Sequence, residues 1–135
     1  MAENFVVKEC LTDAMIEAGA RMTQELIDKG EPLVAAFWLW DPDQNDDWRL
    51  VFSATYPTYR PLFQKIRLVR DEMDEKTKEL LMFAVTQESP DSELVRALRE
   101  TYPTGANVPR KRIKGMVWGK SASKYVHDAL LYLAL

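Results

Sequence analysis

Basic side chains in two segments of the chain are the first candidates for ligand chemistry. Arginine and lysine bind phosphate groups, and aromatic side chains near them stack on the bases of single-stranded nucleic acids. One segment has four basic residues within five positions, Arg110, Lys111, Arg112 and Lys114. The other, on a predicted helix, has Arg60, Lys65, Arg67 and Arg70, and the nearby aromatic residues are Tyr59, Tyr102 and Trp118. We expect a phosphate-binding patch made of Arg110, Lys111, Arg112, Lys114, Arg67 and Arg70; the alternative is that charges at a strand end prevent edge pairing.

Acidic residues gather in the segment DPDQNDD, between two predicted strands. Counted from Asp41, this segment begins like a calcium-binding loop. Position six, which requires glycine, is Asp46, and position twelve, which requires glutamate, is Phe52. We therefore expect a solvated turn whose side chains hydrogen-bond their own backbone, with a weak and irregular divalent site as the alternative.

The chain has one histidine, His127, and one cysteine, Cys10. A transition-metal site with the usual cysteine and histidine ligands cannot be built from so few residues. A Cys–His nucleophile pair is an alternative, but Cys10 stands at a predicted helix entry, where a small buried residue is the ordinary explanation. The sequence has no nucleophile elbow, dinucleotide-binding fingerprint or P-loop. We expect no catalytic site, no metal and no cofactor, and the balance favours a protein that is not an enzyme.

A β-hairpin is the clearest element that positions these residues. Two β-type runs, LVAAFWLW and WRLVFSAT, flank a seven-residue loop at 41–47. In the register that this loop sets, one face is wholly apolar and pairs Trp40 with Trp48, Trp38 with Leu50, Ala36 with Phe52 and Val34 with Ala54. The opposite face pairs Leu39 with Arg49, Phe37 with Val51, Ala35 with Ser53 and Leu33 with Thr55. Because the first strand is apolar on both faces, we expect it to be central, with the second strand nearer an edge.

The apolar excess on the first strand also predicts an association surface. We expect Phe37, Leu39 and Trp118 to form this surface and to contact a second copy of the chain or another protein. The protein is then a small interaction or assembly module and a homodimer. A nucleic-acid-binding accessory protein that uses the basic patch is the alternative function.

Hydrophobic periodicity predicts the remaining elements. A helix at about 12–29 has its apolar stripe at Leu11, Met15, Ala18, Met22 and Leu26, and its thin middle around Gly19 allows close contact with a sheet. A second helix begins at YPTYRP, and its apolar stripe is Leu62, Ile66, Val69 and Met73. A third helix begins at Ser89-Pro90. The run Leu80 to Val85 is predicted as a buried strand, with a continued helix as the alternative. Residues 113–133 are predicted as a second hairpin, although Leu130 to Leu135 alone also fits a helix.

Length and composition fit a single domain over residues 1–135, with 47% hydrophobic residues and a net charge of −3. This mildly acidic charge argues against general affinity for nucleic acids. The longest apolar run, Leu33 to Trp40, is far shorter than the ~20 residues of a membrane helix. The segment MAENFVVKEC lacks the features of a signal peptide. We expect a soluble cytoplasmic protein of α+β class, with a largely antiparallel sheet of about five strands and three helices in the order α-β-β-α-β-α-β-β.

This order of elements resembles a group of short prokaryotic proteins with no assigned function. The similar segments are FWLWD, DWRLVFSA, SPDSELVRAL and YVHDALLYL, and together they cover about half of the chain. Members of the group have a glycine-flanked hairpin whose last strand alternates tyrosines with aliphatic residues, whereas the loop KSASK departs from their pattern. The resemblance implies a strand at the C-terminal end and implies no activity or site residue.

Overall fold

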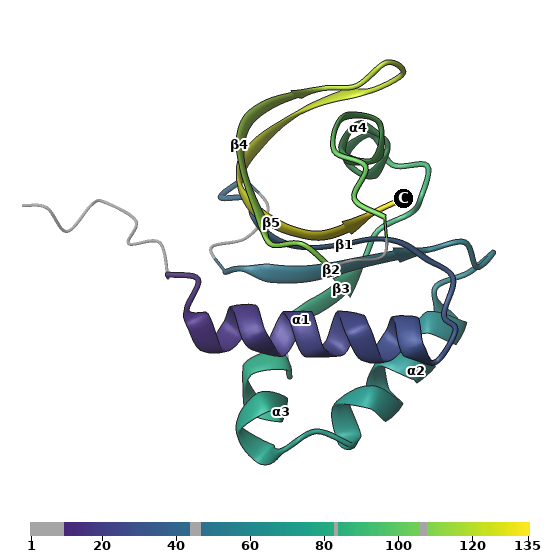
Figure 1. Cartoon of the computed structure of the whole chain (residues 1–135), viewed down its shortest axis with the longest axis vertical. Helices are drawn as coiled ribbons and strands as arrows, with labels where there is room; N and C mark the ends of the chain where they lie inside the picture. The colour runs from purple at the N-terminus through teal and green to yellow at the C-terminus, as the bar shows by residue number, and fades with distance from the viewer. Residues whose placement is uncertain (1–9, 44–46, 83, 106–107) are drawn as a thin grey trace, which may run out of the picture.

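The computed structural model describes residues 10–43, 47–82, 84–105 and 108–135, which form four helices and one five-stranded sheet (Figure 1). The helices are α1 (Asp13–Asp28), α2 (Arg60–Asp71), α3 (Glu75–Leu81) and α4 (Glu93–Thr101). The strands are β1 (Leu33–Trp40), β2 (Arg49–Ala54), β3 (Val85–Gln87), β4 (Lys111–Trp118) and β5 (Ser123–Ala134). In the sheet order β3-β2-β1-β5-β4, β3 runs parallel to β2 and the other neighbours are antiparallel. The α+β class is confirmed, but the sheet is mixed and the described residues form four helices instead of three.

The strand predicted at Leu80 to Val85 is wrong over most of its length. Residues Glu75–Leu81 form α3, and β3 begins only at Val85; residue 83 lies outside the described residues. Asp74 caps the start of this helix, because its carboxylate accepts hydrogen bonds from the backbone N–H and the hydroxyl of Thr77. These bonds hold the pKa of Asp74 below its usual value. An apolar run of this length fits a helix or a strand, and the cap at Asp74 favours the helix.

The third predicted helix forms, but it begins later than Ser89-Pro90. The side chain of Ser92 caps α4 by accepting a hydrogen bond from the N–H of Val95. The hydroxyl of Ser89 instead accepts a hydrogen bond from the N–H of Asp91, within the turn that leads into the helix. Both serines therefore bond to backbone near the helix start, and Ser92 is the cap.

The register of the β1–β2 hairpin is confirmed over most of its length. The observed pairs include Ala35 with Ser53, Ala36 with Phe52, Phe37 with Val51, Trp38 with Leu50 and Leu39 with Arg49. Beyond them the register shifts, so that Leu33 pairs with Ala54. The predicted pairs of Val34 with Ala54 and of Leu33 with Thr55 are therefore wrong. β1 is the central strand of the described sheet, and β2 is separated from the edge by the three-residue β3. The second hairpin is also confirmed, because β4 and β5 pair as antiparallel strands.

Helices cover both faces of the central strands. α1, α2 and α3 lie on one face, and α4 lies on the other, where β4 and β5 curve around it (Figure 1). The first face carries a core that includes Trp38, Leu50 and Phe52, together with the predicted stripes of α1 and α2. The second carries a core that includes Phe37 and Val51. The apolar character of β1 on both sides is therefore explained by two cores within one chain.

Helix α1 comes very close to the sheet at Gly19. A Cβ atom at this position would lie 2.5 Å from Nε1 of Trp38 and 2.7 Å from the hydroxyl oxygen of Tyr132. The indole N–H of Trp38 donates to the Tyr132 hydroxyl at 3.0 Å, and this hydroxyl donates to the carbonyl oxygen of Ile16 in α1. Burial raises the pKa of Tyr132 well above its usual value, so the hydroxyl keeps the proton that it donates. A short chain of hydrogen bonds thus attaches α1 to the sheet.

We predict that Gly19→Ala lowers the free energy of unfolding by about 1–3 kcal/mol, because the added methyl group overpacks this contact. Helix propensity alone predicts the opposite, a gain of ~1 kcal/mol. Chemical denaturation followed by circular dichroism measures the change. Ala14→Gly, at an exposed position of the same helix, serves as the control for propensity. A Gly19→Ala protein as stable as the parent, or more stable, contradicts the close packing.

Candidate functional site

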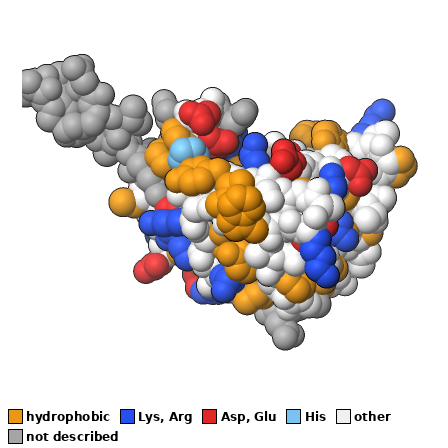
Figure 2. Space-filling view, turned by 90° about the horizontal axis from the view of Figure 1, so that it is seen from above, with side chains coloured by type: hydrophobic (Ala, Val, Ile, Leu, Met, Phe, Trp, Pro, Cys, Tyr) orange, Lys and Arg blue, Asp and Glu red, His pale blue; other side chains and the backbone are white. Residues whose placement is uncertain are grey.

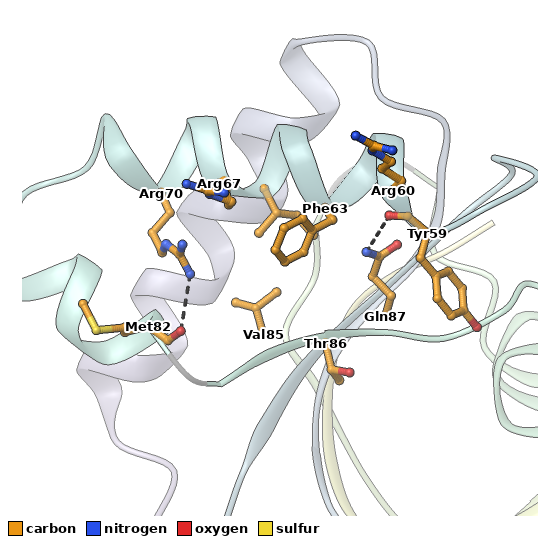
Figure 3. A pocket seen from close by; sticks show the side chains of 10 residues that line it. Tyr59, Arg60, Phe63, Arg67, Arg70, Met82, Val85, Thr86 and Gln87 are labelled. Atoms are coloured by element: carbon orange, nitrogen blue, oxygen red, sulfur yellow. Dashed lines mark hydrogen bonds between the residues drawn. The ribbon is translucent and has the colours of Figure 1, made fainter.

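A groove with a volume of about 560 Å³ lies between α2, the segment after α3, and β3 (Figure 3). We call it the α2–β3 groove. Its apolar lining is formed by Phe63, Ile66, Met82 and Val85, and its basic lining by Arg60, Arg67 and Arg70. Tyr59, Thr86 and Gln87 complete the walls. The groove therefore combines apolar contact surface with guanidinium groups.

Helical spacing explains why α2 supplies most of this lining. Arg60, Phe63, Arg67 and Arg70 follow one another at intervals of three, four and three residues. Such residues lie on one face of a helix. The neighbouring face carries Leu62, Ile66 and Val69, which are buried in the first core. One side of α2 thus packs against the protein while the adjacent side presents arginines and a phenyl ring to the groove.

Two hydrogen bonds fix the walls of the groove relative to each other. Nη1 of Arg70 donates to the carbonyl oxygen of Met82 at 3.3 Å, which satisfies a carbonyl just after α3 (Figure 3). Nε2 of Gln87 in β3 donates to the carbonyl oxygen of Tyr59 at 2.9 Å. The first bond connects the end of α2 to the segment after α3, and the second connects the start of α2 to β3.

The groove leaves large apolar side chains in contact with water. Phe63 is 54% exposed and Met82 is 49% exposed. None of the described residues that line the groove is acidic, and within the described part of the chain no carboxylate forms an ion pair with Arg60 or Arg67. A guanidinium group that forms no ion pair within its own chain is able to bind a carboxylate or phosphate of a ligand through paired hydrogen bonds. The arrangement suits a ligand with anionic groups beside an apolar body.

The structure divides the predicted phosphate patch between the two edges of the sheet. Arg67 and Arg70 line the groove beside β3, whereas residues 110–114 lie at and just before β4, the opposite edge strand. At β4, Arg110 donates two hydrogen bonds to the carboxylate of Glu17 in α1. The hydrogen bond from Arg110 holds the pKa of Glu17 below its usual value. The two basic segments therefore do not form one surface.

The other basic residues of β4 have partners as well. Arg112 donates two hydrogen bonds of 2.6 Å to Asp128, whose side chain is 1% exposed. The bond to this carboxylate raises the pKa of Arg112 above its usual value. Nζ of Lys114 lies 3.8 Å from the same carboxylate, and Nζ of Lys111 lies 5.2 Å from the ring centre of Tyr102. These charges hold β4 to its neighbours.

The three residues predicted as an association surface lie in different environments. Phe37 is completely buried in the core beneath α4, so its place on a surface is a wrong prediction. Leu39 is half-buried and lines a second hollow of about 550 Å³, among the charged residues Asp41, Asp47, Arg49, Glu88, Glu93 and Lys124. Trp118 is 72% exposed at the end of β4, near the exposed pair Met116 and Tyr125.

Arg60, Phe63 and Met82 were not among the six residues of the predicted phosphate patch, although Arg60 was named with the other basic residues of its helix. The signal for the first two was present, because both share the helical spacing of Arg67 and Arg70. Met82 carried no such signal, since its segment was predicted as a strand.

Comparisons with protein families, with curated proteins and with solved structures find no match. Among the described residues, no helix has the length and apolar character needed to cross a membrane. The function must therefore be inferred from the geometry of the chain itself.

We predict that Arg112→Met lowers the free energy of unfolding by about 3 kcal/mol. The substitution removes two hydrogen bonds from the buried carboxylate of Asp128. The expected value is at the lower end of the usual range, because Arg112 is 44% exposed and Lys114 stays 3.8 Å from the same carboxylate. Urea denaturation measures the change. Lys111→Met, which removes a neighbouring exposed charge, is the control and should have a much smaller effect. Equal effects of the two substitutions would contradict a specific role for the Arg112–Asp128 pair.

Proposed function

We propose that the protein is a small interaction module that binds an acidic, amphipathic segment of a partner protein in the α2–β3 groove. The observation that carries this proposal is the row of Arg60, Arg67 and Arg70 beside an exposed apolar lining. A partner segment with apolar side chains on one side can cover Phe63 and Met82. Carboxylates beside those side chains then pair with the arginines, which gives charge complementarity.

Apolar contacts and ion pairs contribute differently to binding in this groove. Burial of apolar surface contributes roughly 25 cal/mol per Å², so Phe63 and Met82 supply most of the affinity. Ion pairs at an open rim contribute less, about 0–1 kcal/mol each, but they discriminate against basic partners. The groove is therefore expected to bind acidic segments with moderate affinity and clear preference by charge.

This proposal keeps the predicted interaction module but moves its surface away from the sheet face. Both faces of β1 are covered within the chain, so an exposed sheet face is not required. The nucleic-acid alternative has less support, because Arg110 and Arg112 are bound to carboxylates and the two basic segments lie at opposite sheet edges. The proposal also keeps the cytoplasmic location, since Cys10 is a free, exposed thiol and the cytosol keeps thiols reduced.

We predict that the protein binds a labelled synthetic peptide rich in glutamate and leucine, and that Arg67→Glu weakens this binding about tenfold, or ~1.4 kcal/mol. Fluorescence anisotropy measures the affinity. Lys65→Glu is the matched control, because it makes the same charge change at an exposed position of α2 outside the groove lining.

Three outcomes contradict the proposal. The first is equal weakening by Lys65→Glu and Arg67→Glu, which indicates a non-specific charge effect. The second is equal binding of a peptide in which lysines replace the glutamates. The third is tighter binding of a single-stranded oligonucleotide than of the acidic peptide, which favours the nucleic-acid alternative.

We also propose that the protein forms a homodimer, through the exposed side chains of Met116, Trp118 and Tyr125 on β4 and β5. These are 41%, 72% and 56% exposed. We expect light scattering to give a mass near twice the 15.6 kDa of one chain, and Trp118→Ser to shift it toward the single-chain value. Phe63→Ser, in the groove, is the control and should leave the mass unchanged. A single-chain mass for the parent protein at micromolar concentration contradicts the dimer.

A further inference from the structure

Three potential metal ligands from distant parts of the chain meet beside the turn that follows β1. Asp41 and Asp43 belong to this turn, and His127 belongs to β5. Each offers a ligand atom that lies within 4.8 Å of the other two. Nε2 of His127 is 3.7 Å from Oδ2 of Asp43. These residues are separate from the α2–β3 groove, and none of them takes part in the proposed function.

The pairing of β1 with β5 explains why these residues meet. Trp40, the last residue of β1, is paired with Asp128, so the chain that leaves β1 passes beside His127. The register between β4 and β5 also shifts here: Ile113 pairs with Ala129, but Gly115 pairs with Val126. Two residues of β5, His127 and Asp128, therefore lie opposite the single residue Lys114. Bulges of this kind change the direction of side chains and often occur beside functional sites.

The imidazole ring of His127 is held by aromatic neighbours. The ring of Tyr125 contacts it edge to face, with ring centres 4.8 Å apart, and the ring of Trp40 lies in a similar orientation at 6.2 Å. Figure 2 shows the histidine among hydrophobic side chains, with acidic side chains next to it. The side chain of His127 remains 33% exposed and that of Asp43 is 83% exposed. The ring is thus positioned by packing while its nitrogen faces the acidic turn.

The acidic side of the cluster has local order as well. The backbone N–H of Asp43 donates to Oδ1 of Asp41 at 3.0 Å. This is a turn closed by an aspartate side chain, and it brings two carboxylates to the same side of the backbone as the imidazole.

We propose that Asp41, Asp43 and His127 bind a divalent transition-metal ion such as Zn²⁺ or Mn²⁺. Bonds from such ions to nitrogen and oxygen ligands are about 2.0–2.2 Å long, so two ligands of one ion lie at most about 4.4 Å apart. The three ligand atoms are already near this limit, and small rotations of the half-buried Asp41 and exposed Asp43 carboxylates bring them within it. An imidazole ligand favours transition metals over Ca²⁺ and Mg²⁺, which take oxygen ligands. Water completes the coordination.

The proposal revises the expectation of no metal site, in which carboxylate ligands were sought within the acidic loop and His127 was not combined with them. The calcium-loop pattern fails there because its glycine and glutamate are missing. The third ligand comes instead from β5, more than eighty positions along the chain from Asp43. Asn45 and Asp46 of that loop lie outside the described residues, and the proposed site does not use them.

The test titrates ZnCl₂ into chelator-treated protein by calorimetry and follows MnCl₂ addition by ¹H NMR. We expect one Zn²⁺ per chain and at least tenfold weaker binding in both His127→Ala and Asp43→Asn. Asp91→Asn, which removes an exposed acid elsewhere, is the control and should bind as the parent does. Because the chain has one histidine, its imidazole signals are identified without ambiguity, and Mn²⁺ should broaden them at substoichiometric concentration.

The outcomes separate metal binding from a simple His–Asp contact. Loss of Zn²⁺ affinity in both variants, with selective broadening of the imidazole signals, supports the site. Unchanged Zn²⁺ affinity in His127→Ala overturns it, as does a spectrum in which the imidazole signals do not respond to Mn²⁺. Tighter binding of Ca²⁺ than of Zn²⁺ also overturns it, because that result requires a site made of oxygen ligands. Circular dichroism of each variant verifies that it is folded.

Discussion

The approach of α1 to the sheet at Gly19 determines the arrangement of one whole layer of the protein. With no side chain at this position, the helix backbone reaches the indole of Trp38 and the phenol of Tyr132, and a hydrogen-bond chain joins them. α1 then serves as the base on which α2 and α3 pack. Two exposed ion pairs, Arg21 with Asp74 and Lys29 with Glu72, connect α1 to the ends of these helices. The direction in which α2 presents its arginines therefore depends on a glycine in another helix.

The parts of the fold that could be predicted are those decided by local pattern. Alternation of apolar residues specified the register around Trp38, and the stripe ending at Leu26 specified α1. The run Leu80 to Val85 was not decided in this way, because an apolar run of that length satisfies both periodicities. Its structure depends on the cap at Asp74 and on the pairing of β3 with β2, which the local pattern did not resolve.

For the candidate sites too, local sequence pattern predicted some features, whereas others depend on distant contacts. The spacing of the basic residues indicated a basic face on α2, so Arg67 and Arg70 were correctly placed on one helix. The basic residues at β4 were wrongly grouped with them, since Arg110 bonds to a carboxylate 93 positions away and no local pattern marks such a pair. Phe37 was recognised as apolar on the far side of β1, but nothing in that strand specified that α4 would cover it. In both cases the environment of the side chain is decided by a partner far away in the sequence.

The placement of β5 has a consequence for how the chain reaches its native state. β5 lies beside β1 in the middle of the sheet, and the hydrogen-bond partner of Trp38 stands 94 positions later in the sequence. During synthesis on the ribosome, β1 and β2 emerge long before β5 and have an unfilled edge that is rich in large apolar side chains. Pairings over such a separation form slowly, because a long loop must be ordered first. Until β5 arrives, that edge is open to pairing with strands of other chains, which favours aggregation of the incomplete chain over that of the finished protein.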